Sequence, residues 1–309
     1  MKDIKALTVL LIILLVPSVG FSEIFKTYYD NGKLESEVNY KNGQQEGIFK
    51  FYYESGALKR ESTYKNDKKE GLSKGYYEGG KLEWETNYKN DKQEGVSKGY
   101  YESGKLIFEA NYKNGKQEGL FKEYYKNGEL LEESNYKNGQ QEGSVKEYYE
   151  NGELESETNL KNGQPEGLYK SYYKNLKLKA EVNYKNGQQE GPSNRYYVNG
   201  RLKKEASFKN GQQEGLSKRY YESGILQHES NYKNGKQEGP VKEYYENGDL
   251  KFTANYKNYK PEGLSRIYYE NGKLRQETIF KEGQVANIKT YSEIGKLESN
   301  KDYPYKEEN

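Results

Sequence analysis

The stretch NYKNGKQEGLFKEYYKNGEL, residues 111–130, decides the fold because close copies of it run along nearly the whole chain. Its Tyr-Tyr pair recurs every 24 residues, from Tyr28 to Tyr268, without an insertion. Gly119 and Leu130 keep the same spacing through most of the other copies. A fixed period of this size indicates a repeat protein whose units bury their apolar faces only against neighbouring units.

Each unit has the pattern of a β-hairpin. In residues 47–64, GIFKFYYESGALKRESTY, the pair Ser55-Gly56 fits a two-residue hairpin turn, and many other copies carry Asn-Gly at this place. A turn of this length predicts that Tyr53 lies opposite Leu58. Helix is a poor alternative because glycine and Asn-Gly pairs interrupt every unit several times.

The same register predicts two further cross-strand pairs, Phe51 with Arg60 and Lys50 with Glu61. Side chains alternate between the two faces of a strand, so we expect one face to carry Tyr53, Leu58, Ser62 and Tyr64. We expect the other face, which is charged, to carry Lys50, Tyr52, Lys59 and Glu61.

The predicted fold class is all-β, an elongated repeat array of antiparallel β-hairpins with 24-residue units in a single coiled meander sheet. Eleven hairpin repeats span residues 23–279, and a degenerate capping repeat with a polar C-terminal tail spans residues 280–309. Some copies lack an expected glycine, as where Leu176 stands at the turn and Tyr259 in the longer loop.

Composition supports an ordered array and argues against nucleic acid as a partner. The chain has 35 tyrosines, whose rings can be buried while their hydroxyls stay hydrated. The 50 Lys and Arg residues nearly balance the 48 Asp and Glu residues, so no strong positive field attracts a phosphate backbone. The sequence has no cysteine, which excludes a disulfide, a thiolate metal site and a lipid-attachment cysteine.

The N-terminus has the pattern of a secretory signal peptide over residues 1–22. Lys2 and Lys5 precede the apolar run Ala6–Val16, and small residues stand before a predicted cleavage site after Ser22. An N-terminal membrane anchor is the alternative, but the run falls short of the roughly 20 apolar residues that span a bilayer. We therefore predict export to the periplasm, the cell surface or the medium, with no transmembrane segment in the mature chain.

No arrangement of residues indicates catalysis, a metal site or a cofactor. His228 is the only histidine, and Ser230 nearby is not marked as an activated nucleophile. A glutamate recurs in almost every repeat, as at Glu133, but ten equivalent carboxylates do not provide the one pair with separated pKa values that a hydrolase needs. The loops lack the spaced acidic oxygens of a calcium site. We therefore predict a non-enzymatic protein without a cofactor.

The predicted interaction surface is the charged face. Lys122 is predicted to lie directly opposite Glu133 on this face. The tyrosines of the same face are predicted to be available to a partner, and they include Tyr52, Tyr76, Tyr100, Tyr124, Tyr148, Tyr196, Tyr220 and Tyr244. A protein is the leading partner class, and a glycan is an alternative because sugar rings stack on aromatic side chains without needing net charge.

The segments YYENGKL (268–274) and NYKNGKQEGLFKEYYKNGEL resemble the bacterial variant of the MORN (membrane occupation and recognition nexus) repeat. The resemblance covers about residues 24–300 and implies a β-hairpin fold used as a scaffold or binding surface. It also implies a common label of such bacterial proteins, the antitoxin component of a toxin–antitoxin system. The leading prediction is an exported adhesion or scaffold protein at the cell envelope or a host surface, and the alternative is an antitoxin or immunity protein.

Overall fold

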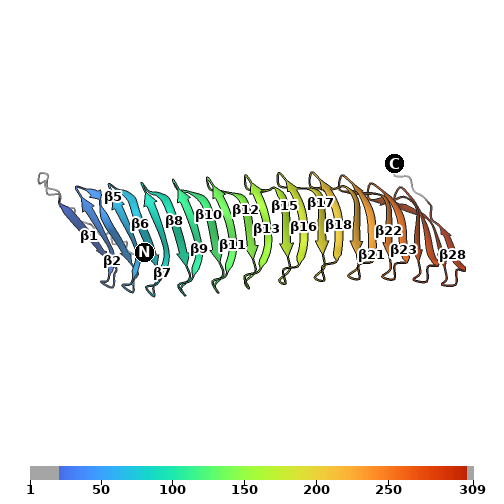
Figure 1. Ribbon diagram of the computed structural model, residues 1–309, viewed down its shortest axis with the longest axis horizontal. Coiled ribbons are helices and arrows are strands. Elements are labelled where there is room, and N and C mark those ends of the chain that lie inside the picture. The colour runs from blue at the N-terminus through green and yellow to red at the C-terminus, as the bar shows by residue number, and fades with distance from the viewer. Residues whose placement is uncertain (1–20, 305–309) are drawn as a thin grey trace, which may run out of the picture. The chain divides into compact units, whose positions relative to one another are not determined.

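The computed structural model describes residues 21–304, and these residues form strands and turns without a helix (Figure 1). The strands belong to one antiparallel sheet of 28 strands, built from tandem hairpins. The predicted all-β class and the hairpin repeats are thus confirmed. The predicted signal peptide lies outside the described residues, apart from Phe21 and Ser22, of which Ser22 begins the first strand.

Each hairpin has one strand that ends in the Tyr-Tyr pair and one that begins at the repeated leucine. The first kind comprises β1 (Ser22–Tyr28), β4 (Gly47–Tyr52), β6 (Lys68–Tyr76), β8 (Lys92–Tyr100), β10 (Lys116–Tyr124), β12 (Gln140–Tyr148), β15 (Gly167–Tyr172), β17 (Gln188–Tyr196), β20 (Gly215–Tyr220), β22 (Lys236–Tyr244), β25 (Gly263–Tyr268) and β27 (Gln284–Tyr291). The second kind comprises β2 (Leu34–Lys41), β5 (Leu58–Lys65), β7 (Leu82–Lys89), β9 (Leu106–Lys113), β11 (Leu130–Lys137), β13 (Leu154–Lys161), β16 (Leu178–Lys185), β18 (Leu202–Lys209), β21 (Leu226–Lys233), β23 (Leu250–Lys257), β26 (Leu274–Lys281) and β28 (Leu297–Asp302). Four two-residue strands complete the sheet, β3 (Gln44–Gln45), β14 (Gln164–Pro165), β19 (Gln212–Gln213) and β24 (Lys260–Pro261).

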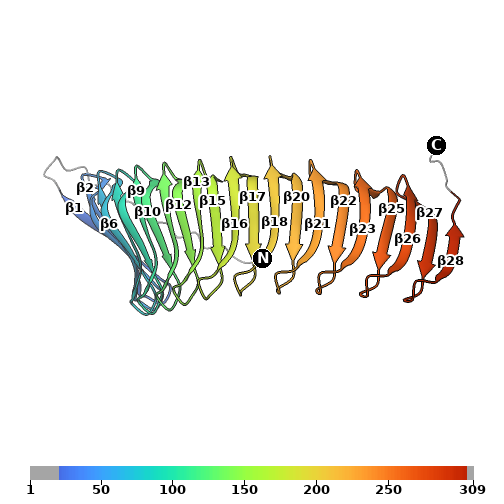
Figure 2. The same ribbon diagram turned by 45° about the vertical axis from the view of Figure 1, so that its right-hand side comes forward.

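The chain divides into two units, residues 1–104 with 112–115 and residues 105–111 with 116–309. In the second unit the strands from β13 to β28 lie side by side in chain order, and both views show this arrangement (Figures 1 and 2). Each long strand there pairs antiparallel with the next, as β17 does with β16 and β18.

The hairpin turn has three residues rather than the predicted two. The Tyr53 backbone N–H donates to the Ala57 carbonyl at 2.8 Å, and the Gly56 N–H donates to the Tyr53 carbonyl at 2.8 Å. The loop is therefore Glu54-Ser55-Gly56, with Gly56 at a φ of 92°. A turn followed by a residue in the left-handed region favours glycine, which explains the recurrent glycine at this place.

Two of the three predicted cross-strand pairs are confirmed, namely Lys50 with Glu61 and Phe51 with Arg60. The third is wrong, because Leu58 lies opposite Tyr52 rather than Tyr53. The register changes between these pairs, so Lys59 is an extra residue that forms a β-bulge. At pairs farther from the loop, a three-residue loop with a bulge therefore gives the same register as a two-residue turn without one.

The bulge moves two side chains away from their predicted faces. Leu58 shares a face with its partner Tyr52, so it belongs to the charged face. Lys59 instead places its Nζ 5.3 Å from the ring centroid of Tyr53. We call the face of Lys50 and Glu61 the ladder face, and the face of Ser62 the serine face.

Small side chains form the buried core of this one-layer sheet. Ser62 lies opposite Phe49 and Ser73 in the middle of the serine face, and all three side chains are at most 2 % exposed. The prediction that Leu58 lies on this face is therefore wrong, whereas Ser62 and Tyr64 lie on it as predicted. Serine, threonine, alanine and valine occupy most of the central row. Rings of the flanking row cover it, as Tyr64 does by stacking on Phe49 with centroids 4.3 Å apart.

Candidate interaction surfaces

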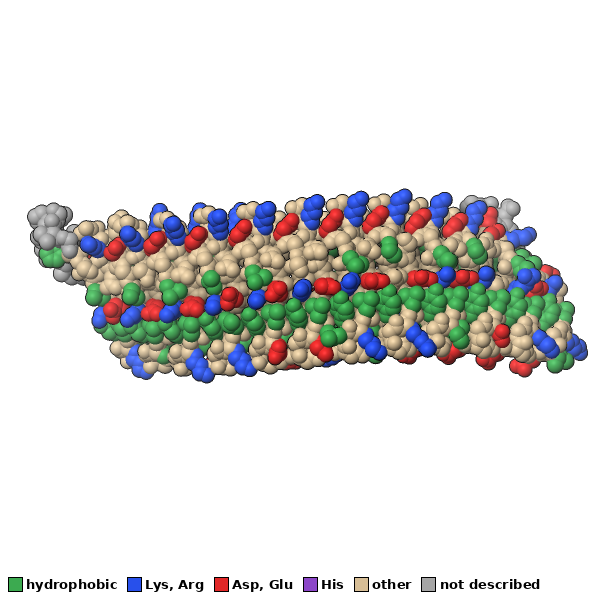
Figure 3. Space-filling model, viewed as in Figure 1, with side chains coloured by type: hydrophobic (Ala, Val, Ile, Leu, Met, Phe, Trp, Pro, Cys, Tyr) green, Lys and Arg blue, Asp and Glu red, His purple; other side chains and the backbone are tan. Residues whose placement is uncertain are grey.

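Lysine and glutamate alternate from strand to strand on the ladder face, and we call this row the charge ladder. Lys122 lies directly opposite Glu133, with 3.5 Å between Nζ and Oε2, which confirms the predicted pair. Glu133 also lies opposite Lys146 on its other side. Figure 3 shows a line of alternating basic and acidic side chains on this face. Both Lys122 and Glu133 are about one-third exposed, so such a pair contributes about 0.2–1 kcal/mol.

In six repeats the first tyrosine of the pair is bound to the charge ladder. Tyr76 donates its hydroxyl to Glu61 Oε1 of the preceding repeat at 2.7 Å. The equivalent bond is made by Tyr100, Tyr172, Tyr196, Tyr220 and Tyr244. Burial, together with this bond and the charge of Glu61, raises the pKa of Tyr76 to about 12.

These contacts restrict the predicted contact surface. Five of the eight predicted tyrosines, Tyr76, Tyr100, Tyr196, Tyr220 and Tyr244, donate their hydroxyls within the array, which leaves their rings for a partner. Tyr52, Tyr124 and Tyr148 occupy the same place in their repeats. The sequence signal for this contact is the constant spacing of 15 residues between the glutamate and the tyrosine that reaches it.

The second tyrosine of each pair binds the following repeat. Tyr53 donates its hydroxyl to the backbone carbonyl of Tyr76 at 2.8 Å. The same bond recurs in nine further repeats, from Tyr29, Tyr77, Tyr125, Tyr149, Tyr173, Tyr197, Tyr221, Tyr245 and Tyr269. The Tyr-Tyr pair therefore connects each hairpin to both of its neighbours.

A carboxylate connects the repeats at the opposite ends of the strands, and sequence reasoning missed it. Glu70 Oε2 accepts a hydrogen bond from the Asn90 backbone N–H, 20 residues later, at 2.9 Å. Asn90 has a φ of 49°, a conformation that asparagine tolerates better than most residues. This contact gives a structural reason for the recurrent Glu-Gly and Lys-Asn pairs of the longer loop.

An exposed apolar residue stands in the same place of many repeats on the ladder face. Leu120, Leu168, Leu216 and Leu264 in the second unit are 40–45 % exposed. In the first unit, Ile48 and Leu72 flank a shallow hollow of about 180 Å³ that Glu61 and Lys74 also line. Exposed apolar positions beside a charged row are typical of an interaction surface.

One row of the serine face differs in chemistry from repeat to repeat, and we call it the variable row. It lies two residues from the buried serine row. In consecutive long strands of the first unit it runs through Thr27, Ser36, Phe51, Arg60, Gly75, Trp84 and Gly99. In the second unit it runs through Glu123, Glu132, Glu147, Ser156, Ser171, Ala180, Arg195, Lys204, Arg219, His228, Glu243 and Phe252. The frame of the repeats is constant, so this row carries most of the information that distinguishes one hairpin from the next.

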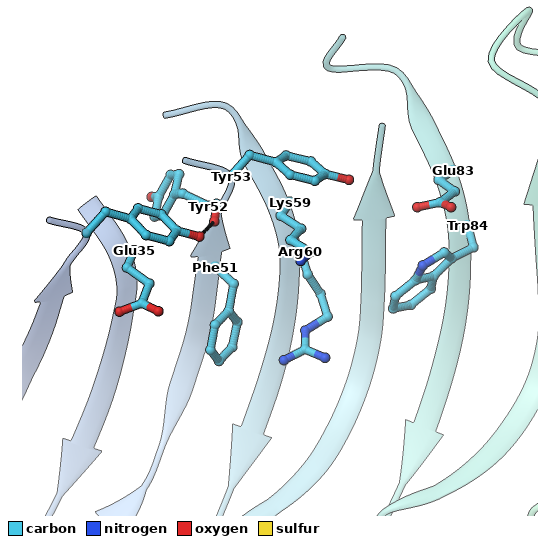
Figure 4. Close-up of a pocket in the computed structure, with 9 residues that line it drawn as sticks. Glu35, Phe51, Tyr52, Tyr53, Lys59, Arg60, Glu83 and Trp84 are labelled. Atoms are coloured by element: carbon cyan, nitrogen blue, oxygen red, sulfur yellow. Dashed lines mark hydrogen bonds between the residues drawn. The ribbon is translucent and has the colours of Figure 1, made fainter. Parts of the chain in front are cut away.

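The variable row of the first unit contains a hollow of about 370 Å³ (Figure 4). Phe51, Arg60 and Trp84 line it, with the Arg60 guanidinium stacked 4.5 Å from the Phe51 ring centroid. Glu35 of β2 and Glu83 of β7 lie at its edge, each at the β-bulge of its strand.

Gly75 makes room for the indole in this hollow. A Cβ atom at Gly75 would overlap the Trp84 ring, so the ring rests directly against the backbone of β6. The Arg60 Nε is buried and has no hydrogen-bond partner among residues 21–304. The hollow thus combines aromatic side chains, an unused guanidinium donor and carboxylates, which is chemistry suited to a polar ring.

His228 lies in the variable row between a carboxylate and a serine hydroxyl, which is the order of groups in a catalytic triad. Its Nδ1 is 3.5 Å from Glu243 Oε1, and its Nε2 is 3.1 Å from Ser230 Oγ. Burial is the main cause that lowers the pKa of His228. Ser230 is only 1 % exposed, so its hydroxyl is shielded from a substrate.

A family model described as MORN repeat variant matches eleven segments of the chain, residues 24–42, 45–66, 69–90, 93–114, 117–138, 141–162, 165–186, 189–210, 213–234, 237–258 and 261–282. Each segment contains one hairpin with its bulge, so sequence family and structural repeat coincide. No curated protein is detectably similar to the chain in sequence. Within residues 21–304 no helix is long and apolar enough to cross a bilayer.

Solved structures of toxin complexes also match. A chain in the structure titled "Crystal Structure of TcdB2-TccC3-Cdc42" is 14 % identical, with 90 % of this chain and 18 % of that chain covered and a TM-score of 0.18. For a Photorhabdus luminescens Tc holotoxin pore the identity is 13 %, the coverage 89 % and 17 %, and the TM-score 0.20. The chain spans less than a fifth of these proteins, and at these TM-scores they carry no weight for its function.

Proposed function

Because the chain belongs to the MORN repeat variant family, we propose that it is an exported, non-enzymatic scaffold that binds another macromolecule at the cell envelope or at a host surface. The observation that supports this proposal is the variable row of the serine face. Repeat proteins recognise partners through a surface that changes along a constant frame. Export rests on the signal-like pattern of residues 1–22.

The first unit offers the sharpest test, because Trp84 is the only tryptophan of the chain and lines the hollow. Partner binding at the variable row should change the Trp84 fluorescence. We expect Phe51→Ala to weaken binding of the purified chain to envelope or host-cell surfaces, measured as the bound fraction of labelled protein. Leu72→Ser tests the competing ladder face, and it should leave this binding unchanged if the variable row makes the contact.

Two results would contradict the proposal. One is surface binding that is unaffected by Phe51→Ala, which would exclude the variable row as the contact. The other is full-length protein with an intact Met1 in the cytosol after cell fractionation, which would exclude export. That second result would favour the antitoxin or immunity alternative.

A glycan is the second candidate ligand, and the hollow at Phe51 and Trp84 favours it. Sugar rings stack on aromatic faces, while the Arg60 guanidinium and the Glu35 and Glu83 carboxylates hydrogen-bond hydroxyl groups. The ladder-face tyrosines suit a sugar less well, since six of their hydroxyls are bound to glutamates. Glycan-array binding that Trp84→Ala abolishes and Tyr148→Phe retains would support this candidate, and the absence of any glycan signal would exclude it.

A further inference from the structure

Like charges stand directly opposite one another in the variable row of the second unit. Glu132 lies opposite Glu123 on one side and Glu147 on the other. Farther along the row, Lys204 lies between Arg195 and Arg219. Directly opposed like charges destabilise a sheet, whereas the ladder face of the same strands alternates its charges.

Among the described residues, hydrogen bonds to two of the acids, and no ion pair, offset the repulsion within these groups. None of these six side chains forms an ion pair within residues 21–304. Glu132 accepts a hydrogen bond from Gln141 Nε2 at 2.9 Å, and Glu147 accepts one from Ser156 Oγ at 2.8 Å. Burial and then Glu132 raise the pKa of Glu123, while burial and then the two arginines lower the pKa of Lys204.

The two charged groups are arranged symmetrically about Ser171, with opposite signs. Counting long strands outward from Ser171 in both directions, the row meets Ser156 and Ala180 first. The next three pairs at equal strand distance are Glu147 with Arg195, Glu132 with Lys204, and Glu123 with Arg219. A two-fold axis parallel to the strands and above Ser171 would therefore place every acid of the first group over a base of the second.

We propose that the serine face of the second unit binds a second copy of this chain, in a two-fold dimer with its axis above Ser171. Two sheets that pack face to face lie about 10 Å apart, a distance that facing Glu and Lys or Arg side chains span. Small residues at Ser156, Ser171 and Ala180 allow close approach at the centre. The interface is isologous, as in most soluble dimers.

A buried hydrogen-bond donor close to Lys204 in the sequence, the side-chain amide of Gln213, fits this arrangement. Gln213 Nε2 is buried and has no acceptor among residues 21–304. Gln141 holds the equivalent place three repeats earlier and donates to Glu132. In the repeat of Gln213 the position equivalent to Glu132 is occupied by Lys204, which cannot accept a hydrogen bond. In the dimer, Glu132 of the second copy faces Lys204, and rotation of the Gln213 amide out of its buried position would bring Nε2 toward this acceptor. A partner of unrelated sequence would not be expected to place a carboxylate beside Gln213.

Charge reversal separates the dimer from a purely structural role. Glu132→Lys removes two like-charge contacts within the chain, so it should raise the melting temperature while weakening self-association at least about tenfold. Lys204→Glu should have the same two effects. The double variant Glu132→Lys with Lys204→Glu recreates opposite charges across the interface and should restore association.

Glu157→Lys is the matched control, because this glutamate belongs to the charge ladder between Lys146 and Lys170. It should lower the melting temperature and leave association unchanged. The measurement is sedimentation equilibrium of the full chain at low and high salt, with thermal unfolding by circular dichroism. A chain that stays monomeric at low salt, or an association that Glu132→Lys leaves intact, would overturn the proposal, and neither result bears on the hollow at Trp84.

Discussion

At the residue scale, the tyrosine pair explains why the repeat tolerates so few aliphatic side chains. Tyr76 donates to Glu61 of the repeat before it, and Tyr77 donates to the Tyr100 carbonyl of the repeat after it. Each ring fills space on a thin sheet, and each hydroxyl satisfies an acceptor that would otherwise need water. Leucine or phenylalanine would fill the same space but could not donate the hydrogen bond that joins neighbouring repeats.

Tyr76→Phe should lower the free energy of unfolding by about 1 kcal/mol, because it removes a part-buried hydrogen bond to a carboxylate. Tyr148→Phe is the control and should cost less, since no hydrogen bond of the Tyr148 hydroxyl is found within residues 21–304. Urea unfolding of both variants measures the difference. Equal losses for the two would show that the bond to Glu61 contributes nothing.

The raised pKa of about 12 for Tyr76, and likewise for Tyr172, Tyr196 and Tyr220, makes the array sensitive to alkali. An ordinary tyrosine loses its proton near pH 10, so between pH 10 and 12 the folded chain holds protons that the unfolded chain has released. The stability gained from these tyrosines is complete below pH 10 and lost as the pH rises toward 12. The measurement is alkaline titration of tyrosinate absorbance for the parent chain and for Tyr76→Phe, whose difference reports on Tyr76. A difference that rises near pH 10 while the fold persists would contradict this expectation.

The turn residue Leu176 is a second local test. It stands where other repeats have glycine, at a φ of 60°, and it is 55 % exposed. Leu176→Gly should raise the free energy of unfolding by about 0.5–1 kcal/mol, because it relieves the left-handed strain at the cost of some chain entropy. Gly200→Ala, one repeat later at a φ of 87° with no atom within 4 Å of the new Cβ, should lower it. Thermal melts of both variants decide the sign.

At the element scale, the hairpin register was predictable for its outer pairs and not for its loop. Lys50 with Glu61 follows from alternation alone, whereas the bulge at Lys59 leaves no clear trace in the sequence. Ser-Gly and Asn-Gly suit both a two-residue turn and a three-residue loop, so loop length stayed ambiguous. The variable row was missed for a related reason, because its members stand out only once the register places them side by side.

The Lys122–Glu133 pair tests this register. Glu133→Lys should lower the free energy of unfolding by about 0.5–1 kcal/mol, because the new lysine would face both Lys122 and Lys146. Adding Lys122→Glu should recover only about half of the loss, since the contact with Lys146 stays repulsive. A double-mutant cycle by urea unfolding measures the coupling, and strictly additive effects would refute the cross-strand contact.

At the scale of the whole molecule, stability and recognition are distributed differently over the two faces. The charge ladder, both tyrosine rows and the loop glutamates repeat in nearly every unit, so each hairpin is held by its neighbours alone. The variable row has no such constancy, and its chemistry depends on position along the chain. Adding or removing units should therefore change recognition far more than folding.

Deletion of residues 121–144 tests both the expected tolerance of folding and the expected change in recognition. The deletion joins Leu120 to Val145, which continues the 24-residue register, so the shortened chain should keep its far-UV β signal with a modestly lower melting temperature. Deletion of residues 121–132 removes half a hairpin and should abolish cooperative unfolding. The whole-unit deletion also removes Glu123 and Glu132, so it should weaken salt-sensitive self-association although the fold survives. A shortened chain that unfolds at the outset would show that stability is not carried by neighbouring repeats.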